Sequence, residues 1–266
     1  MLHKLNVFLF FSFVFVALSC KKTDSNLSAN STPCYVTTLS TNGIQTVSLS
    51  YDYQVSKATN YDSLTGTTTG YTTYAYDGSS KIDKVTYYNT SYLITSYINF
   101  IYNSDTTLVS DTTYYIYGSI TYKTGYRTYS YNSLKQMTLS VNYMSVGLGS
   151  NTFEVVSSEA YTYTSNGNVA TEKNYDGSSN LVTTTTYTYD NNPAFASNSD
   201  IDPGNPEFEN KNNVLSATTV DASGNAVAAD SYTITYIYNS DNYPILGEKK
   251  YQNGTSQTDV IAYNCD

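Results

Sequence analysis

The sequence predicts an all-β protein: an antiparallel meander of about 12–14 strands, built from repeated tyrosine-rich hairpins, that forms a curved or barrel-like sheet. Three observations lead to this prediction. Apolar and polar residues alternate, the commonest residue types are strand formers such as tyrosine and threonine, and one aromatic phrase recurs along the chain. Tyrosine alone supplies 31 of the 266 residues.

The recurring phrase is an aromatic residue, a spacer and a tyrosine, followed by a short polar turn and an aliphatic residue. It is clearest in the stretch 161–169, YTYTSNGNV. Except at the last interval, successive copies lie about 25–30 residues apart, which is the length of two strands and two turns. Each copy therefore predicts one hairpin. The second tyrosines of the phrase are Tyr76, Tyr102, Tyr131, Tyr163, Tyr189 and Tyr238.

Alternation within the segments supports strands. Between Val47 and Val55 the odd positions are apolar or aromatic and the even positions are polar, which places five side chains on one face of an extended segment. No sustained three-to-four spacing predicts a helix after residue 19. At the turns, Asp77-Gly78 and Asn166-Gly167 are expected to accept positive φ angles.

The tyrosines themselves have two interpretations. Cross-strand tyrosine and threonine pairs contribute about 0.2–1 kcal/mol each, so they can hold together a sheet with a thin core. Alternatively, their rings stack on sugars or other flat ligands. We favour the structural interpretation, because the tyrosines follow the period of the repeat and do not cluster at one place in the sequence.

The N-terminal residues have the features of an export signal. Residues 1–19 contain Lys4 followed by an apolar run, Leu5 to Leu18, that is shorter than the roughly 20 residues of a spanning helix. The sequence Ala17-Leu18-Ser19-Cys20 resembles the lipobox of bacterial lipoproteins, which implies cleavage before Cys20 and acylation of its thiol. Ordinary signal cleavage and an uncleaved membrane anchor are the alternatives. Residues 20–33 are polar and predict a flexible tether to a domain spanning 34–266.

Lipidation of Cys20 leaves an even pair of cysteines, Cys34 and Cys265, at the two ends of this domain. A disulfide between them requires Cα atoms within about 7 Å. Either the sheet curls round, or the first strand crosses back to the last, or no bridge exists. We expect the bridge, which predicts adjacent first and last strands.

The remaining composition excludes several function classes. The only histidine, His3, lies in the predicted signal, which rules out Ser-His-Asp and Cys-His catalysis and histidine metal sites in the exported chain. Without Lys4 the chain has 12 basic and 22 acidic residues, a formal charge of −10, so a nucleic-acid partner is not expected. No motif indicates a cofactor or a catalytic site. A carboxylate pair for sugar cleavage is the remaining enzymatic alternative.

Residues 191–213 interrupt the repeat and predict a long surface loop, the expected place for a specific function. Its four acidic residues could supply oxygen ligands to calcium, although their spacing does not match an EF-hand. A solvated acidic loop is the simpler interpretation, and we predict no metal site. The four residues are Asp200, Asp202, Glu207 and Glu209.

The repeats resemble the YD repeats of bacterial RHS-type proteins and of teneurins. Tyr76-Asp77, Tyr189-Asp190 and the series Tyr163, Gly167, Val169 carry the likeness. The later half, from Tyr187 to Tyr243, also looks like an uncharacterised family of bacterial lipoproteins with tyrosine-rich repeats. This resemblance implies β-hairpin repeats and an anchored protein, and it implies no activity.

The expected protein is therefore exported and attached through an N-terminal lipid to the bacterial cell envelope, with the outer membrane as the expected location. It acts as a non-catalytic binding or structural module on the cell surface or in the periplasm, with a protein or glycan partner left open. The alternative is a glycan-binding lipoprotein that uses exposed tyrosines and the 191–213 loop.

Overall fold

The computed structural model describes residues 34–52, 54–194 and 202–265, so the predicted signal, the predicted tether and Cys20 lie outside the described residues. In the described part, no helix is long and apolar enough to span a bilayer. Its sixteen strands begin with β1 Cys34–Thr41, β2 Ile44–Asp52, β3 Gln54–Tyr61, β4 Thr68–Tyr76, β5 Ile82–Tyr88, β6 Ile94–Tyr102, β7 Leu108–Tyr117 and β8 Ile120–Tyr131. They continue as β9 Met137–Ser145, β10 Phe153–Tyr163, β11 Val169–Asp176, β12 Leu181–Pro193, β13 Asn212–Asp221, β14 Tyr232–Tyr238, β15 Pro244–Tyr251 and β16 Ser256–Cys265. A short 3₁₀ helix, η1 (Pro206–Glu209), precedes β13.

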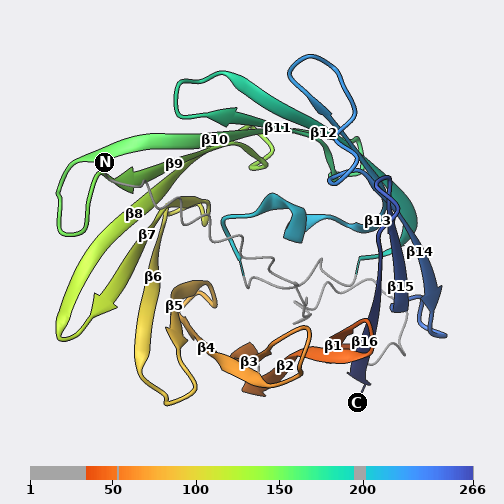
Figure 1. Cartoon of the computed structure of the whole chain (residues 1–266), viewed down its shortest axis with the longest axis horizontal. Helices are drawn as coiled ribbons and strands as arrows, with labels where there is room; N and C mark the ends of the chain where they lie inside the picture. Colours follow the sequence, from red (N-terminus) through yellow and green to blue (C-terminus); the bar gives the residue numbers. More distant parts are fainter. Residues whose placement is uncertain (1–33, 53, 195–201, 266) are drawn as a thin grey trace, which may run out of the picture.

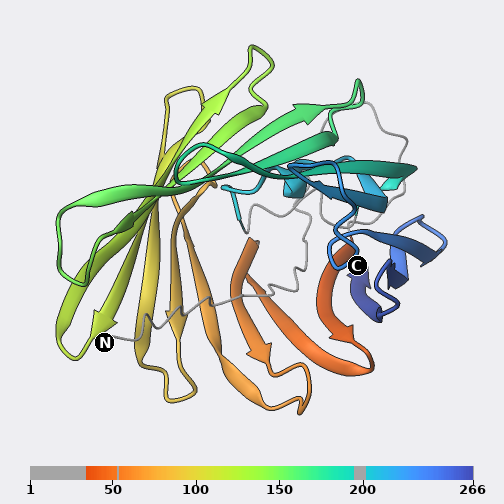
Figure 2. The same ribbon diagram turned by 45° about the horizontal axis from the view of Figure 1, so that its top comes forward.

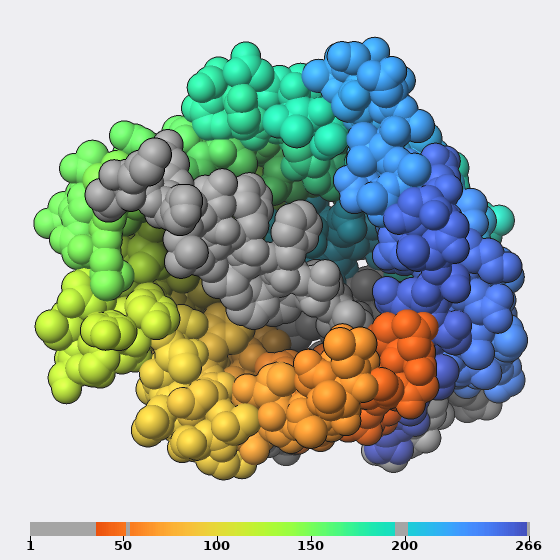
Figure 3. Space-filling view, viewed as in Figure 1, coloured from red at the N-terminus to blue at the C-terminus, as the bar shows by residue number. Residues whose placement is uncertain are grey.

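The strands form one closed antiparallel barrel. Each strand pairs with its sequence neighbours, and β1 closes the ring against β16 (Figures 1 and 2). In the space-filling view the coloured strands and turns form a ring (Figure 3). The predicted all-β meander and the adjacent first and last strands are thus confirmed. Closure leaves no strand edge open to pairing with another chain.

The barrel has more strands than the 12–14 predicted from the repeat. The predicted single strand from Val47 to Val55 is two strands, because β2 ends at Asp52 and β3 starts at Gln54. Val47, Leu49 and Val55 still pack against the same core cluster. The apolar residues occupy odd positions on both sides of the turn between β2 and β3. The alternation therefore continues through the turn and could not reveal it.

The five-residue turns share one mechanism. The first residue is usually Asp or Asn, and its side chain accepts hydrogen bonds from the third and fifth backbone N–H groups, as Asp77 does from Ser79 and Lys81. The fourth residue has positive φ: 63° at Ser80 and 89° at Gly167. The prediction of positive φ is therefore right for Gly167. At Asp77-Gly78 it is misplaced, because the residue with positive φ is Ser80, two positions after Gly78. The side-chain bonds hold non-glycine residues in a conformation that costs about 1–2 kcal/mol.

The repeat tyrosines form a ladder of hydrogen bonds around one end of the barrel. Six tyrosines at or near the ends of even-numbered strands donate their hydroxyl to a backbone carbonyl near the start of the preceding strand. Tyr238 differs, because its hydroxyl donates to the Asp190 carboxylate. Tyr102 donates to Ile82 at 3.0 Å and Tyr163 donates to Met137 at 2.6 Å. The other bonds of this kind join Tyr51 to Val36, Tyr76 to Val55, Tyr189 to Val169 and Tyr263 to Pro244. Phenylalanine could not make these bonds, which explains the choice of tyrosine.

The same end of the barrel holds the apolar core. Three clusters of buried residues lie there, and the repeat aliphatics Ile82, Leu108, Met137 and Val169 are among their members. Towards the opposite end, the inward-facing side chains of the sheet are mainly tyrosine, threonine and charged residues. The lumen therefore has an apolar layer at the end of the barrel where Cys34 and Cys265 lie and a polar layer beyond it.

Candidate functional site: the polar lumen and its pocket

Residues 202–211, called here the lumen segment, run inside the barrel with η1 at their centre (Figure 1). Pro206, Phe208 and Asn210 are buried, and the predicted surface loop is wrong for this part of 191–213. The prediction failed because asparagines and acids were read as groups that need water. Inside a barrel of this width, polar partners on the walls satisfy them instead.

Asparagines fasten the C-terminal end of the lumen segment to the turn between β10 and β11. The Asn210 side chain accepts a 2.7 Å bond from the backbone N–H of Val169, and the Lys211 N–H donates to Asn168 at 2.6 Å. Asn168 also donates to the Asn212 side chain at 3.0 Å. Because the carboxamides of Asn168 and Asn210 are almost fully buried, each of these hydrogen bonds replaces one that water would otherwise make.

An ion pair fastens the N-terminal end. Asp111, only 1% exposed, accepts a 2.8 Å bond from Arg127, and Tyr129 donates to the same carboxylate oxygen. Burial raises the pKa of Asp111, and the Arg127 charge opposes that rise. Arg127 also lies 3.6 Å from Asp202. A Cβ atom on Gly204 would lie 2.4 Å from the Tyr129 hydroxyl oxygen, so only glycine permits this approach.

A belt of carboxyl groups and tyrosines crosses the polar layer. Tyr187 donates to Glu172 at 3.0 Å, and Tyr161 donates to Glu159 at 2.9 Å. From the lumen segment, Glu207 joins Glu172 and Tyr187. Burial, together with the charge of Glu172, raises the pKa of Glu207 to about 7. Burial also raises the pKa of Glu159.

The four acids considered for calcium do not converge. Asp202 faces Arg127, Glu207 faces Glu172, Glu209 is exposed, and Asp200 lies outside the described residues. Among the residues with described positions, no group of three or more metal-ligating side chains comes together. The calcium interpretation therefore has no geometry to support it here.

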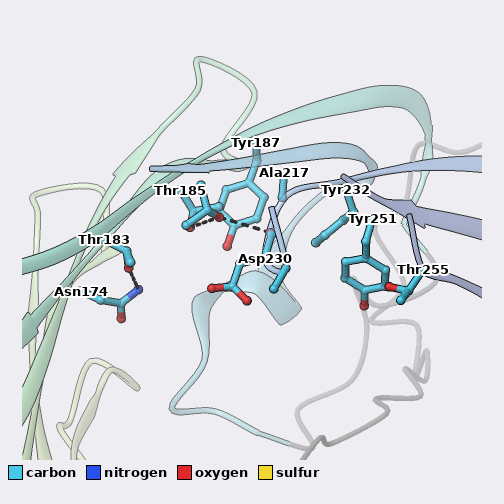
Figure 4. Close-up of a pocket in the computed structure, with 11 residues that line it drawn as sticks. Asn174, Thr183, Thr185, Tyr187, Ala217, Asp230, Tyr232, Tyr251 and Thr255 are labelled. Atoms are coloured by element: carbon cyan, nitrogen blue, oxygen red, sulfur yellow. Dashed lines mark hydrogen bonds between the residues drawn. The ribbon is translucent and has the colours of Figure 1, made fainter. Parts of the chain in front are cut away.

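Beyond the belt, a cavity of about 470 Å³ opens at the end of the barrel away from Cys34 and Cys265. It lies between β11, β12, β13, β14 and β15 and the connection from β13 to β14 (Figure 4). Its lining is polar and hydroxyl-rich: Asn174, Thr183, Thr185, Tyr187, Ala217, Thr219, Ala229, Asp230, Tyr232, Tyr251 and Thr255. We call it the mouth pocket.

One half-buried cation, Lys249, lies next to the mouth pocket. The Lys249 ammonium is 4.1 Å from the centroid of the Tyr232 ring and 5.7 Å from that of Tyr251. The two rings meet edge to face, with centroids 5.7 Å apart. Burial lowers the pKa of Lys249, while Asp259 and Glu207 oppose that shift.

The backbones of the two cysteines predicted to pair lie opposite each other. Cys34 and Cys265 are register partners on β1 and β16. Opposed residues in antiparallel strands have Cα atoms about 4.5–5.5 Å apart, within the range of about 4.4–6.8 Å that a disulfide needs. The bond itself stays a prediction.

Sequence reasoning identified none of Asp111, Arg127, Glu172 and Lys249 as site residues. One signal was available: each is a charged residue at an inward-facing position in a strand. Outward-facing charges are ordinary, but an inward charge in a β-barrel requires a partner inside the lumen. Asp111 and Arg127 are register partners on β7 and β8, and Glu172 meets Tyr187 across β11 and β12. Their contacts with Asp202 and Glu207 come from the distant lumen segment and could not be predicted.

No protein-family model matches the sequence, and no curated protein matches it. Among solved structures, the chain is similar to a porin-like protein from Bacteroides vulgatus, with 14% identity over 86% of this chain and 98% of that one and a TM-score of 0.52. A porin-like protein from Bacteroides uniformis matches with 9% identity over 90% of this chain and 94% of that one, with a TM-score of 0.51. At these identities the likeness shows a shared barrel fold.

Proposed function

We propose that the protein is a lipid-anchored, non-catalytic binding module of the bacterial envelope whose ligand enters the mouth pocket. The pocket is the observation that carries this proposal. Its volume of about 470 Å³ falls within the roughly 300–1,000 Å³ of small-molecule sites. Most of its lining side chains lie on strands, where the sheet fixes them, and Ala229, Asp230 and Thr255 lie in the connections.

The outer face of the barrel supports attachment by lipid. Lys57, Lys84 and Lys123 point outward, and each ammonium lies over a surface tyrosine ring at 4.1–4.4 Å. A membrane-inserted barrel has an apolar outer band about 25 Å tall, and a lysine at its centre costs about 2–4 kcal/mol. Polar threonines occupy many of the other outward positions, as Thr184, Thr186 and Thr188 do on β12. The proposal therefore places the anchor at Cys20 and the barrel outside the bilayer.

The position of the first strand fits the same arrangement. Residues 20–33 would join the lipid to Cys34, at the end of the barrel opposite the mouth pocket. The pocket would then face away from the membrane. A Cys34–Cys265 disulfide would fasten the strand that carries the tether to the last strand of the ring.

The alternative glycan-binding surface finds less support. Residues 202–211 of the 191–213 loop lie in the lumen. Several outward tyrosines are stacked in pairs, among them Tyr71 with Tyr92 and Tyr126 with Tyr143. Tyr97 stacks on Tyr114 with centroids 4.7 Å apart, and Lys84 covers the Tyr97 ring. Rings that are already stacked and covered offer a ligand little free face.

Thermal-shift measurements against fractionated small molecules from the envelope test the proposal. A tryptophan at Ala229, an exposed residue of the pocket wall, should fill the pocket without disturbing the barrel. Ala226→Trp is the matched control, because Ala226 is exposed in the same connection and does not line the pocket. We expect at least one fraction to stabilise the wild type and Ala226→Trp but not Ala229→Trp. If no fraction stabilises the wild type, or if Ala229→Trp responds equally, the binding function is wrong.

A further inference from the structure

The hydroxyl groups of the mouth pocket retain hydrogen-bonding capacity. Thr185 and Thr219 bond to each other at 2.9 Å, and Thr219 also donates to the Asp230 backbone carbonyl at 3.2 Å. Asn174 donates to Thr183 at 3.3 Å. A hydroxyl offers one donor and two acceptor positions, so Thr183 keeps its donor position and Thr185 keeps an acceptor position. The lining can therefore both donate and accept, which suits a ligand that does the same.

The charges around the pocket disfavour a charged ligand of either sign. Asp230 is the one charged residue of the lining, and its carboxylate points into the pocket (Figure 4). Behind Tyr187 lies Glu172, so an anion would meet carboxylates on two sides. A cation would meet the Lys249 ammonium, which already lies against the Tyr232 and Tyr251 rings. A neutral ligand avoids both repulsions.

Shape and aromatic content narrow the chemistry further. A neutral ligand with many hydroxyl groups can satisfy the threonine, asparagine and tyrosine side chains together, whereas an apolar ligand would leave them unpaired. Tyr251 supplies a ring for the apolar face of a sugar, and Asp230 supplies two acceptor oxygens for neighbouring hydroxyls. Figure 4 shows these two side chains on the walls of the same space.

We infer that the mouth pocket binds a neutral saccharide, with Asp230 accepting hydrogen bonds from sugar hydroxyls and Tyr251 packing on the ring. This inference rests on the proposed binding function and names its ligand class. It concerns the lumen wall and not the outward tyrosines or the 191–213 loop.

Isothermal titration calorimetry on the purified full-length chain tests it. The neutral probes are maltose, cellobiose and mannobiose, and the charged probes are galacturonate and choline. Asp230→Asn removes the acceptor charge from an exposed side chain and should leave folding intact. Asp241→Asn, in the exposed turn between β14 and β15 at the other end of the barrel, makes the same charge change away from the pocket.

We expect at least one neutral disaccharide to bind, with affinity reduced at least tenfold in Asp230→Asn and less than twofold in Asp241→Asn. Binding of a charged probe alone would overturn the ligand class while leaving the binding function intact. Neutral binding that is unchanged in Asp230→Asn would overturn the site. If no probe binds although an envelope fraction stabilises the chain, the saccharide class is wrong; if neither occurs, the proposed function fails with it.

Discussion

The Glu207 carboxyl makes the lumen segment sensitive to pH. Its pKa rises from 4.5 to about 7, through burial first and the charge of Glu172 second. Between these values the folded chain binds more protons than the unfolded chain, so the contribution of Glu207 to the free energy of unfolding falls as pH rises. Below about pH 4.5 Glu207 is protonated in both states and does not destabilise the folded chain. Above about pH 7 the destabilisation by its buried carboxylate is complete.

Glu207→Gln removes this ionisation while keeping the shape of the side chain. The difference of 7 − 4.5 = 2.5 pKa units, at about 1.4 kcal/mol each, gives a gain of at most about 3–4 kcal/mol for the variant at pH 8.5. At about 2–4 °C per kcal/mol, its Tm should exceed that of the wild type by at most roughly 6–16 °C. At pH 4 the two proteins should unfold at nearly the same temperature.

Thermal unfolding followed by circular dichroism from pH 4 to pH 8.5 measures this difference. Glu248→Gln on the outward face of β15 is the control, and its Tm should follow the wild type at every pH. A Tm difference between Glu207→Gln and the wild type that does not change with pH would refute the reasoning, as would a variant that is less stable at pH 8.5.

Three further substitutions have expected outcomes in chemical denaturation or peptide mapping. Tyr163→Phe should cost about 1–3 kcal/mol, because the buried Met137 carbonyl loses its partner, and an unchanged unfolding midpoint would remove the tyrosine ladder from the account. Gly204→Ala should destabilise by about 1–3 kcal/mol through its clash with Tyr129, and equal stability would mean that the lumen segment does not lie where the structure places it. Cys34→Ser should cost about 2–5 kcal/mol if the disulfide forms, and non-reducing peptide mapping that finds both wild-type thiols free would exclude the bond.

The fold could be predicted from sequence to the extent that it repeats. Tyr76, Tyr102 and Tyr163 mark the strand ends, because each must lie at the end of its strand to reach a carbonyl at the start of the preceding strand. Local geometry imposes this spacing, and a periodic sequence displays it. The early hairpins carry fewer aromatics, and the strand count was therefore low.

The candidate site could not be predicted, since it depends on closure. Arg127 meets Asp202 and Asn168 meets Asn212 only because the barrel encloses the lumen segment. Before closure is known, the acids of 191–213 are indistinguishable from those of a solvated loop. The width of the lumen, a property of the whole ring, decides between the two.

The distance between β1 and β16 tests the closed ring most directly. Ser40 and Val260 are register partners on the outward faces of these strands, and both accept a spin label after replacement by cysteine in a chain whose native cysteines are serine. Double electron–electron resonance should give a distance below about 20 Å, since neighbouring strands lie about 4.8 Å apart. An open meander of the same strands would separate the labels by about 70 Å, from fifteen such spacings, and that result would contradict the barrel.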